Sequence, residues 1–290
     1  MIPAPFDYHR PGTLDEAIGL LARYGAEAKV LSGGMSLLPT LKLRLGSYAH
    51  LVDINRIPGL EYIQEERGLL RIGAGTRQAT LERSELIRTK YPILGDAVPM
   101  IADPLVRNRA TLGGNLANGD PANDGPAIAI ALGAELIVKG RGGERVIPAN
   151  RFYKSLYTTE LKGDEILIEI RIPVPPAKSG GAYRKLKRKT GDFAAAAVAV
   201  QLTLDARGAV ERAGIALTNV GPTPIEAVKA QQFISGKTPD ENNIPETARL
   251  AAQAASPSAD RRGSVEYKRE MARVLAARAI KTALDRAERS

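Results

Sequence analysis

Two glycine pairs are the features of this sequence that point most directly to chemistry. Gly33 and Gly34 form the first pair, and Gly113 and Gly114 form the second, 80 positions later. Small hydroxyl or amide residues flank both pairs: Ser32 and Ser36, and Thr111 and Asn115. Because glycine reaches positive φ and has no side chain, neighbouring N–H groups can converge on an anion. We therefore expect the two segments, residues 32–36 and 111–115, to hold the two sides of one pyrophosphate.

A single glycine pair is more often only a tight turn, and the shared hydroxyl and amide neighbours are what favour an anion site here. Neither segment matches the GxxxxGK[ST] phosphate loop or the GxGxxG dinucleotide fingerprint, which disfavours a P-loop nucleotidase and a Rossmann dehydrogenase. Replacing Gly33 and Gly114 by valine is expected to abolish anion binding and leave a folded protein.

Other reactive side chains are scarce. The chain has no cysteine, which excludes disulfides, zinc-thiolate sites, iron–sulfur clusters and a thiol nucleophile. His9 and His50 are the only histidines and lie 41 positions apart, so a metal site or catalytic triad is expected to have one histidine at most. An organic cofactor or a partner chain must supply any redox reactivity.

The composition is that of a folded, soluble protein. It has 290 residues, 44% hydrophobic and 25% charged, and its richest apolar run, residues 194–200, is far too short to cross a membrane. The first residues lack the basic and apolar regions of a signal peptide, so we expect a cytoplasmic protein without a transmembrane segment. The net charge of +9 permits acidic partners, polyanions or phosphate-bearing cofactors and selects none of them.

The first glycine pair is predicted to lie between a strand and a helix. Thr13 and Glu16 form a capping box for a helix over 13–24, and a strand over 29–31 runs into the glycines. Residues 103–126 show little periodicity and are expected to form a functional or mobile loop. The other predictions are helices at 37–45, 78–85, 92–101 and 127–132 and strands at 50–54, 69–74, 135–139, 145–147 and 165–172.

Residues 173–181, rich in proline and glycine, are the clearest linker, and we place the main domain boundary there. Beyond the linker, the pattern predicts strands at 183–187, 195–204 and 210–218, followed by helices at 224–235, 243–255 and 267–288.

Four segments in this order resemble one family. LSGGMSLLP (31–39), IADP (101–104), TLGGNLANGDPANDGPA (111–127) and YRKLKRKTGDFA (183–194) are similar to the medium, FAD-binding subunit of carbon-monoxide dehydrogenase, a molybdenum hydroxylase related to xanthine dehydrogenase. The resemblance extends from FDYHRP near the start to the helical tail. It implies an α+β fold: a two-lobed FAD-binding domain of the vanillyl-alcohol-oxidase (PCMH) type over 1–176, with lobes of about 1–56 and 57–176. A domain with a three-stranded antiparallel sheet and helices would follow over 177–290.

The resemblance also implies the residues that bind FAD, and it implies no catalytic residue or metal ligand on this chain. The pyrophosphate would be wrapped by Leu31, Ser32, Gly33, Gly34, Met35, Ser36 and Leu37 and closed by Thr111, Gly113, Gly114 and Asn115. Ile101 would pack near the flavin, Asp124 would hydrogen-bond the cofactor, Leu167 would contact it by backbone or packing, Lys185 would approach it from the C-terminal domain, and Phe193 would shield the isoalloxazine.

Three of these residues could also have a structural role without a cofactor. Lys185 could be a solvated lysine, Phe193 a core residue, and Asp124 a polar loop residue. The chain departs from the family pattern at Met35, where CO-oxidising members have histidine, and at Phe193, where they usually have tyrosine or tryptophan. These changes leave the substrate and the electron acceptor open. With no histidine or cysteine in either turn, the FAD would be non-covalent.

The implied function is electron transfer within a complex. Electrons would pass from [2Fe-2S] clusters on a small subunit through FAD to an external acceptor, which could bring the complex to the inner face of the membrane. A large subunit would carry molybdopterin, in a dimer of heterotrimers. The alternatives are the flavoprotein of an aldehyde or N-heteroaromatic hydroxylase, a stand-alone flavin reductase, and a nucleic-acid-binding module using the basic run 184–189. The last is disfavoured because only 4% of the residues are aromatic, which leaves no stacking platform.

Overall fold

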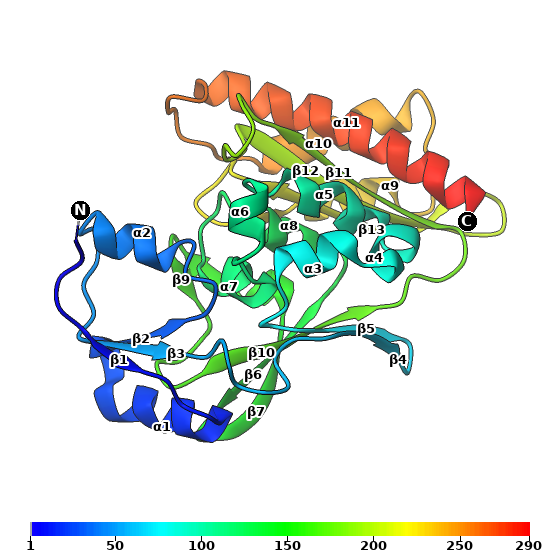
Figure 1. The fold of residues 1–290 in the computed structure, drawn as a ribbon. Coiled ribbons are helices and arrows are strands. Elements are labelled where there is room, and N and C mark those ends of the chain that lie inside the picture. The colour runs from blue at the N-terminus through cyan, green and yellow to red at the C-terminus, as the bar shows by residue number, and fades with distance from the viewer. Residues whose placement is uncertain (1) are drawn as a thin grey trace.

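The computed structural model describes residues 2–290 and contains three larger β-sheets, with helices packed between and over them (Figure 1). The N-terminal lobe lies at lower left in this view, and the long C-terminal helix α11 crosses the top of the molecule.

The N-terminal lobe is a small parallel sheet with strand order β1-β3-β2. Its elements are β1 (Asp7–His9), α1 (Leu14–Tyr24), β2 (Ala28–Leu31), α2 (Leu37–Lys42) and β3 (His50–Asp53). Thr13 caps α1 by accepting the Glu16 amide, as the capping box predicts. The parallel register sets Leu31 opposite Asp53, so the first glycine segment leaves the sheet at the carboxyl ends of β2 and β3.

The pairing of β1 with β3 also brings the two histidines together. His9 and His50 lie on these neighbouring strands, and their ring nitrogens are 3.1 Å apart. The expectation that any histidine site would contain one of them alone is therefore wrong. The contact could not be predicted from the 41-residue separation, because strand pairing joins residues from distant parts of the chain.

The second lobe contains a five-stranded antiparallel sheet with order β4-β5-β10-β6-β7. Its strands are β4 (Ile63–Glu66), β5 (Leu69–Gly73), β6 (Glu135–Gly140), β7 (Gly143–Pro148) and β10 (Ile166–Pro173), and a two-stranded ribbon joins β8 (Tyr153–Ser155) to β9 (Thr158–Thr159). Its helices are α3 (Gln78–Arg83), α4 (Glu85–Lys90), α5 (Pro92–Ala97), α6 (Pro104–Arg107), α7 (Leu112–Ala117) and α8 (Asp124–Ala131).

The expected long loop over 103–126 is wrong, because α6, α7 and the start of α8 lie within it. Asp103 and Thr111 cap α6 and α7 by accepting backbone amides. Both helices are too short to show a helical period, so only their caps could have revealed them. Three other predicted helices end two or more residues early: α2 stops at Lys42, α3 stops at Arg83, and α5 stops at Ala97 and continues as a 3₁₀ turn.

The C-terminal part packs an antiparallel sheet, β11-β12-β13-β14, against helices α9 to α11. The elements are β11 (Ser179–Leu186), β12 (Ala196–Leu204), β13 (Val210–Thr218), β14 (Ile225–Glu226), α9 (Val228–Ile234), α10 (Asn243–Ala254) and α11 (Val265–Arg289). The three predicted strands are present, and the two-residue β14 is added where a helix was expected to begin. The end of the predicted linker belongs to β11, because Gly180 packs against α11: a Cβ there would lie 2.0 Å from the Ala283 carbonyl oxygen.

One hydrophobic core joins the second lobe to the C-terminal sheet. All eight residues of α8 are buried, which is expected of a helix covered on every side. Leu116 and Ile170 belong to the same apolar cluster as Tyr183 and Ala216 of the C-terminal sheet. The two parts on either side of the predicted boundary at 176/177 therefore share one continuous core, and that boundary stays a proposal.

Candidate functional site

The two glycine segments, far apart in sequence, lie against each other. The hydroxyls of Ser32 and Thr111 are hydrogen-bonded at 2.9 Å. A Cβ placed on Gly33 would lie 2.3 Å from the carbonyl oxygen of Arg109, and one placed on Gly114 would lie 3.9 Å from the Ser32 Cβ. The segments, called here the first turn (32–36) and the second turn (111–115), form one continuous surface.

The first turn offers free backbone donors. Within residues 2–290, the amides of Gly33, Gly34, Met35 and Ser36 have no hydrogen-bond partner. Gly34 has φ of +78°, a conformation that residues with side chains rarely adopt. A run of unpaired amides around such a glycine is suited to an anion with several oxygens, such as a diphosphate.

The second turn works differently from what the sequence suggests. The Gly113 amide donates to the Ala74 carbonyl at 2.9 Å, the Gly114 amide to the Thr111 hydroxyl at 3.0 Å, and the Asn115 amide to the Thr111 carbonyl at 3.0 Å. A Cβ on Gly113 would lie 2.5 Å from the Ala74 Cβ. The expectation that both glycine pairs supply free amides is therefore wrong for the second pair. The second turn supplies shape, because α7 and the segment after β5 already use the amides of Gly113, Gly114 and Asn115. Its Thr111 hydroxyl is hydrogen-bonded to the Gly114 amide and the Ser32 hydroxyl.

Asn55 and Arg77, which were not predicted from the sequence, link the two turns by hydrogen bonds. The Asn55 amide nitrogen donates to the Ser32 carbonyl at 2.7 Å, and its oxygen accepts from Arg77 at 2.6 Å. Arg77 also donates to the Arg109 carbonyl, just before the second turn, at 2.5 Å. Burial and the neighbouring Arg109 lower the pKa of Arg77 from its very high ordinary value. The available signal was the place of Asn55 just beyond the strand predicted over 50–54.

Asp124 and Lys185 form a buried ion pair where the FAD-binding region meets the C-terminal sheet. Lys185 Nζ lies 2.8 Å from the Asp124 carboxylate and also donates to the Met100 carbonyl at 3.3 Å. The Tyr183 hydroxyl donates to the same carboxylate. Burial raises the pKa of Asp124, and the ammonium of Lys185 opposes that rise. The side chains of Lys185 and Asp124 are 1% and 5% exposed, so the solvated-lysine and polar-loop alternatives are both wrong.

Phe193 is presented at the surface by a charged loop. Its ring is 45% exposed, which contradicts the core-packing alternative, and the guanidinium of Arg262 lies 5.9 Å from the ring centre. Ion pairs with Arg262 and Arg188 lower the pKa of Asp192 to about 2. An exposed aromatic ring on a fixed loop is suited to stacking on a flat ligand.

Ile101 and Leu167 connect to this surface in different ways. Ile101 is buried and precedes Ala102, whose φ is +44°. A Cβ on Gly191, in the loop of Phe193, would lie 4.0 Å from the Ala102 carbonyl oxygen. Residues 101–110 therefore run from the Phe193 loop to the first turn. The Leu167 side chain lies in the hydrophobic core and reaches the site only through its neighbours, since the Ile168 carbonyl accepts from the Ala74 amide.

The basic run 184–189 is largely engaged within the chain. Arg184 donates to Thr282, Lys185 pairs with Asp124, and Arg188 pairs with Asp192. Three of its cations therefore do not form a free strip for phosphates, which disfavours the nucleic-acid alternative. Among the described residues, no helix combines the length and apolar composition needed to cross a bilayer.

Together, these features fit a flavin dinucleotide: unpaired amides for a diphosphate, and an exposed aromatic ring for a planar heterocycle. The family models agree. The FAD binding domain in molybdopterin dehydrogenase matches residues 4–175, and the CO dehydrogenase flavoprotein C-terminal domain matches residues 181–283.

Similar proteins cover the whole chain. The carbon monoxide dehydrogenase medium chain of Hydrogenophaga pseudoflava is 42% identical and is aligned over 98% of both chains. The 6-hydroxypseudooxynicotine dehydrogenase complex subunit alpha of Paenarthrobacter nicotinovorans is 36% identical, over 99% of this chain and 97% of that protein. A solved structure of carbon monoxide dehydrogenase from Hydrogenophaga pseudoflava, lacking the Mo-pyranopterin moiety, matches with a TM-score of 0.96 at 44% identity, over 99% of both chains.

Proposed function

The chain belongs to the family of FAD-binding flavoprotein subunits of molybdopterin dehydrogenases, and from this premise we propose that it carries electrons through FAD in a molybdenum hydroxylase complex. The contact between the two turns is the observation that supports this most strongly. The Ser32–Thr111 hydrogen bond and the close approach of Gly33 to Arg109 bring both predicted halves of a diphosphate site together.

We assign the cofactor contacts as follows. The amides of the first turn hold the diphosphate, the Thr111 hydroxyl holds Ser32 beside them, and Asn55 and Arg77 keep the two turns in register. The Phe193 ring covers the flavin, and the Asp124–Lys185 pair fixes the adjoining wall by joining it to the C-terminal sheet. Bound FAD exchanges electrons singly or in pairs, which suits a link between one-electron clusters and a two-electron acceptor.

The partners follow from what this chain lacks and from its relatives. Some relatives are named as chains or subunits of larger dehydrogenases. Without cysteine, this chain has no thiolate for an iron–sulfur cluster, so the [2Fe-2S] clusters belong to a small partner and molybdopterin to a large one. We propose a dimer of such heterotrimers in the cytoplasm, with its electron acceptor in solution or at the inner face of the membrane.

A binding experiment tests the cofactor assignment. The purified apoprotein is incubated with FAD, FMN or riboflavin, and the flavin that remains after gel filtration is measured by absorbance. Because the proposed site grips a diphosphate, we expect retention of FAD and loss of FMN and riboflavin. Equal retention of all three flavins would contradict the role of the turns. Asn55→Ala is expected to weaken FAD retention, since it releases both the Ser32 carbonyl and Arg77.

A second experiment tests the complex and its substrate. The chain is purified with its native partners, and reduction of its flavin is followed after adding CO, an aldehyde or an N-heteroaromatic compound. We expect CO to reduce the flavin only when the partners are present. Reduction by one of the other two substrates would identify the related hydroxylase, and full activity without partners would indicate a stand-alone flavin reductase.

A further inference from the structure

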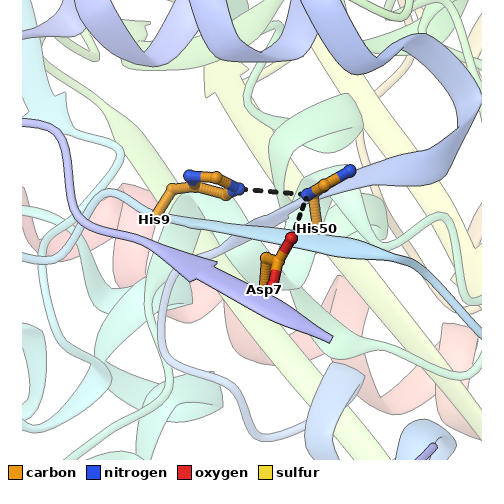
Figure 2. Close-up of side chains that lie close together, drawn as sticks. All are labelled: Asp7, His9 and His50. Atoms are coloured by element: carbon orange, nitrogen blue, oxygen red, sulfur yellow. Dashed lines mark hydrogen bonds and ion pairs between the residues drawn. The ribbon is translucent and has the colours of Figure 1, made fainter. Parts of the chain in front are cut away.

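We propose that Asp7, His9 and His50 form a binding site for a divalent transition-metal ion of the zinc class. The three side chains point toward one another from β1 and β3 (Figure 2). His9 Nε2 lies 3.1 Å from His50 Nδ1, and His50 Nδ1 lies 3.5 Å from the Asp7 carboxylate. One potential ligand atom from each residue lies within 4.8 Å of the others.

These separations match a tetrahedral site. With zinc–ligand bonds of about 2.0–2.1 Å, two ligand atoms of a tetrahedral ion are roughly 3.3 Å apart. The separations of His50 from His9 and from Asp7, 3.1 and 3.5 Å, lie on either side of that value. The ligand atoms of Asp7 and His9 lie within 4.8 Å of each other, so rotation of the exposed Asp7 side chain would complete the site.

The fold holds the ligands in place without the metal. Asp7 and His9 are two positions apart on β1 and therefore point to the same face of the sheet. The parallel register sets Asp7 opposite His50. On the inner side, the Tyr24 ring of α1 stacks on His50 with 3.6 Å between ring centres, which limits rotation of that imidazole.

The donor set identifies the class of ion. Two imidazole nitrogens and one carboxylate suit zinc, nickel or copper, whereas calcium and magnesium prefer oxygen ligands throughout. The Asp7 side chain is 77% exposed and that of His50 is 14% exposed, so one side of the cluster faces water. Water would occupy the remaining coordination position, as it does in zinc sites with three protein ligands.

The site lies away from the proposed cofactor surface. His50 begins β3 and Asp53 ends it, and the first turn leaves the neighbouring strand beside Asp53. His50 and Asp53 are three residue steps apart along the strand, which is about 10 Å. A bound ion would therefore fasten the edge strand β1 to β3 and take no part in electron transfer.

Zinc binding to the full chain, purified without a histidine tag and stripped of metal, provides the test. Affinity and stoichiometry are measured by competition with a chromophoric chelator. We expect one Zn²⁺ per chain in the wild type and at least a ~10-fold weaker affinity in both His9→Gln and His50→Gln, since each loses one of three ligands. Asp15→Asn, which removes an exposed carboxylate from α1 in the same lobe, should bind like the wild type.

Two further measurements keep the test independent of folding. Asp7→Asn changes an exposed side chain and should weaken Zn²⁺ binding while FAD retention stays at the wild-type level. X-ray absorption of the zinc-loaded wild type should show two imidazole ligands, and these can only be His9 and His50 because the chain has no other histidine. Substoichiometric zinc, equal affinity in the histidine variants, or a spectrum without imidazole would overturn the site.

Discussion

At Gly33, space is limited by the protein itself before any cofactor binds. A Cβ at this position would lie 2.3 Å from the Arg109 carbonyl oxygen and 2.8 Å from the Ala110 Cα. Valine at Gly33 is therefore expected to lower the stability of the fold as well as FAD binding, whereas the sequence alone predicted an effect on binding only. The absence of a side chain at Gly33 lets the backbones of the two segments touch. Glycine is therefore required here by the packing of the apoprotein as well as by an anion.

This contact predicts a loss of stability in Gly33→Ala. The added methyl must push two backbone segments apart, which typically costs about 1–3 kcal/mol, and FAD retention should fall as the turns separate. The measurement is urea unfolding of the apoprotein together with FAD binding. Gly19→Ala is the matched control, because a Cβ there meets nothing within 4 Å and alanine favours the helix. Equal stability of Gly33→Ala and wild type would contradict the close contact.

Asp192 gives a prediction that depends on pH. Its pKa is lowered from 3.8 to about 2 by Arg262 and Arg188, so its ion pairs stabilise the folded protein while the carboxylate is charged. The stability it contributes is full above about pH 4 and is lost as the pH falls towards 2. We expect Asp192→Asn to be less stable than wild type near neutral pH, with the difference shrinking on acidification. Unfolding at a series of pH values measures it, and a pH-independent difference would count against the ion pairs.

Among the elements, the short helix α7 has the largest influence on the site. Thr111 caps its N-terminus by accepting the Gly114 amide at 3.0 Å, and the same hydroxyl is hydrogen-bonded to Ser32. One side chain therefore both starts the helix and joins the two turns. α8 has a different role: buried on all sides, it fixes Asp124 at the boundary with the C-terminal sheet.

Replacing the cap should affect stability and binding together. Thr111→Ala loses the cap, at a cost of about 1 kcal/mol, and should weaken FAD binding because the link to Ser32 is gone. Thr111→Ser keeps the hydroxyl and should retain most of both properties. Thermal unfolding and FAD titration of the two variants provide the comparison. If Thr111→Ser were as impaired as Thr111→Ala, the methyl group and not the hydroxyl would be responsible.

At the scale of the whole molecule, the second lobe and the C-terminal sheet share one apolar core. A Cβ on Gly214 of β13 would lie 1.9 Å from the Ala131 carbonyl oxygen at the end of α8, so the two layers are in direct backbone contact. Arg286 of α11 adds an ion pair to Asp96 of α5 at 2.7 Å. The proposed cofactor surface, built from both parts, therefore lies on a junction with direct backbone contact and an ion pair across it.

This shared core predicts cooperative unfolding of these two parts. We expect circular dichroism and tyrosine fluorescence of the apoprotein to report a single coincident urea transition, and FAD to shift its midpoint upward because it binds the folded state. Two separate transitions, with the C-terminal part unfolding alone, would show that the parts are independently stable.

The sequence by itself determined most of the longer helices and strands and the side chains available for chemistry. Capping residues, periodic apolar positions and glycine pairs act over a few neighbouring residues, so the strand-to-helix setting of the first turn and most strands beyond residue 130 could be predicted. The resemblance of four segments to one family added the FAD assignment. Short helices such as α6 and α7 were not predicted, because one or two turns are too few to show a helical period.

Only the tertiary structure decided which distant residues meet. Strand pairing set His9 beside His50, and loop packing set Ser32 against Thr111. It also decided which amides stay free in the first turn and which are consumed in the second. The physical reason is that hydrogen bonds and close packing between remote segments depend on the complete fold, whereas local sequence fixes only the conformations that each segment can bring to it.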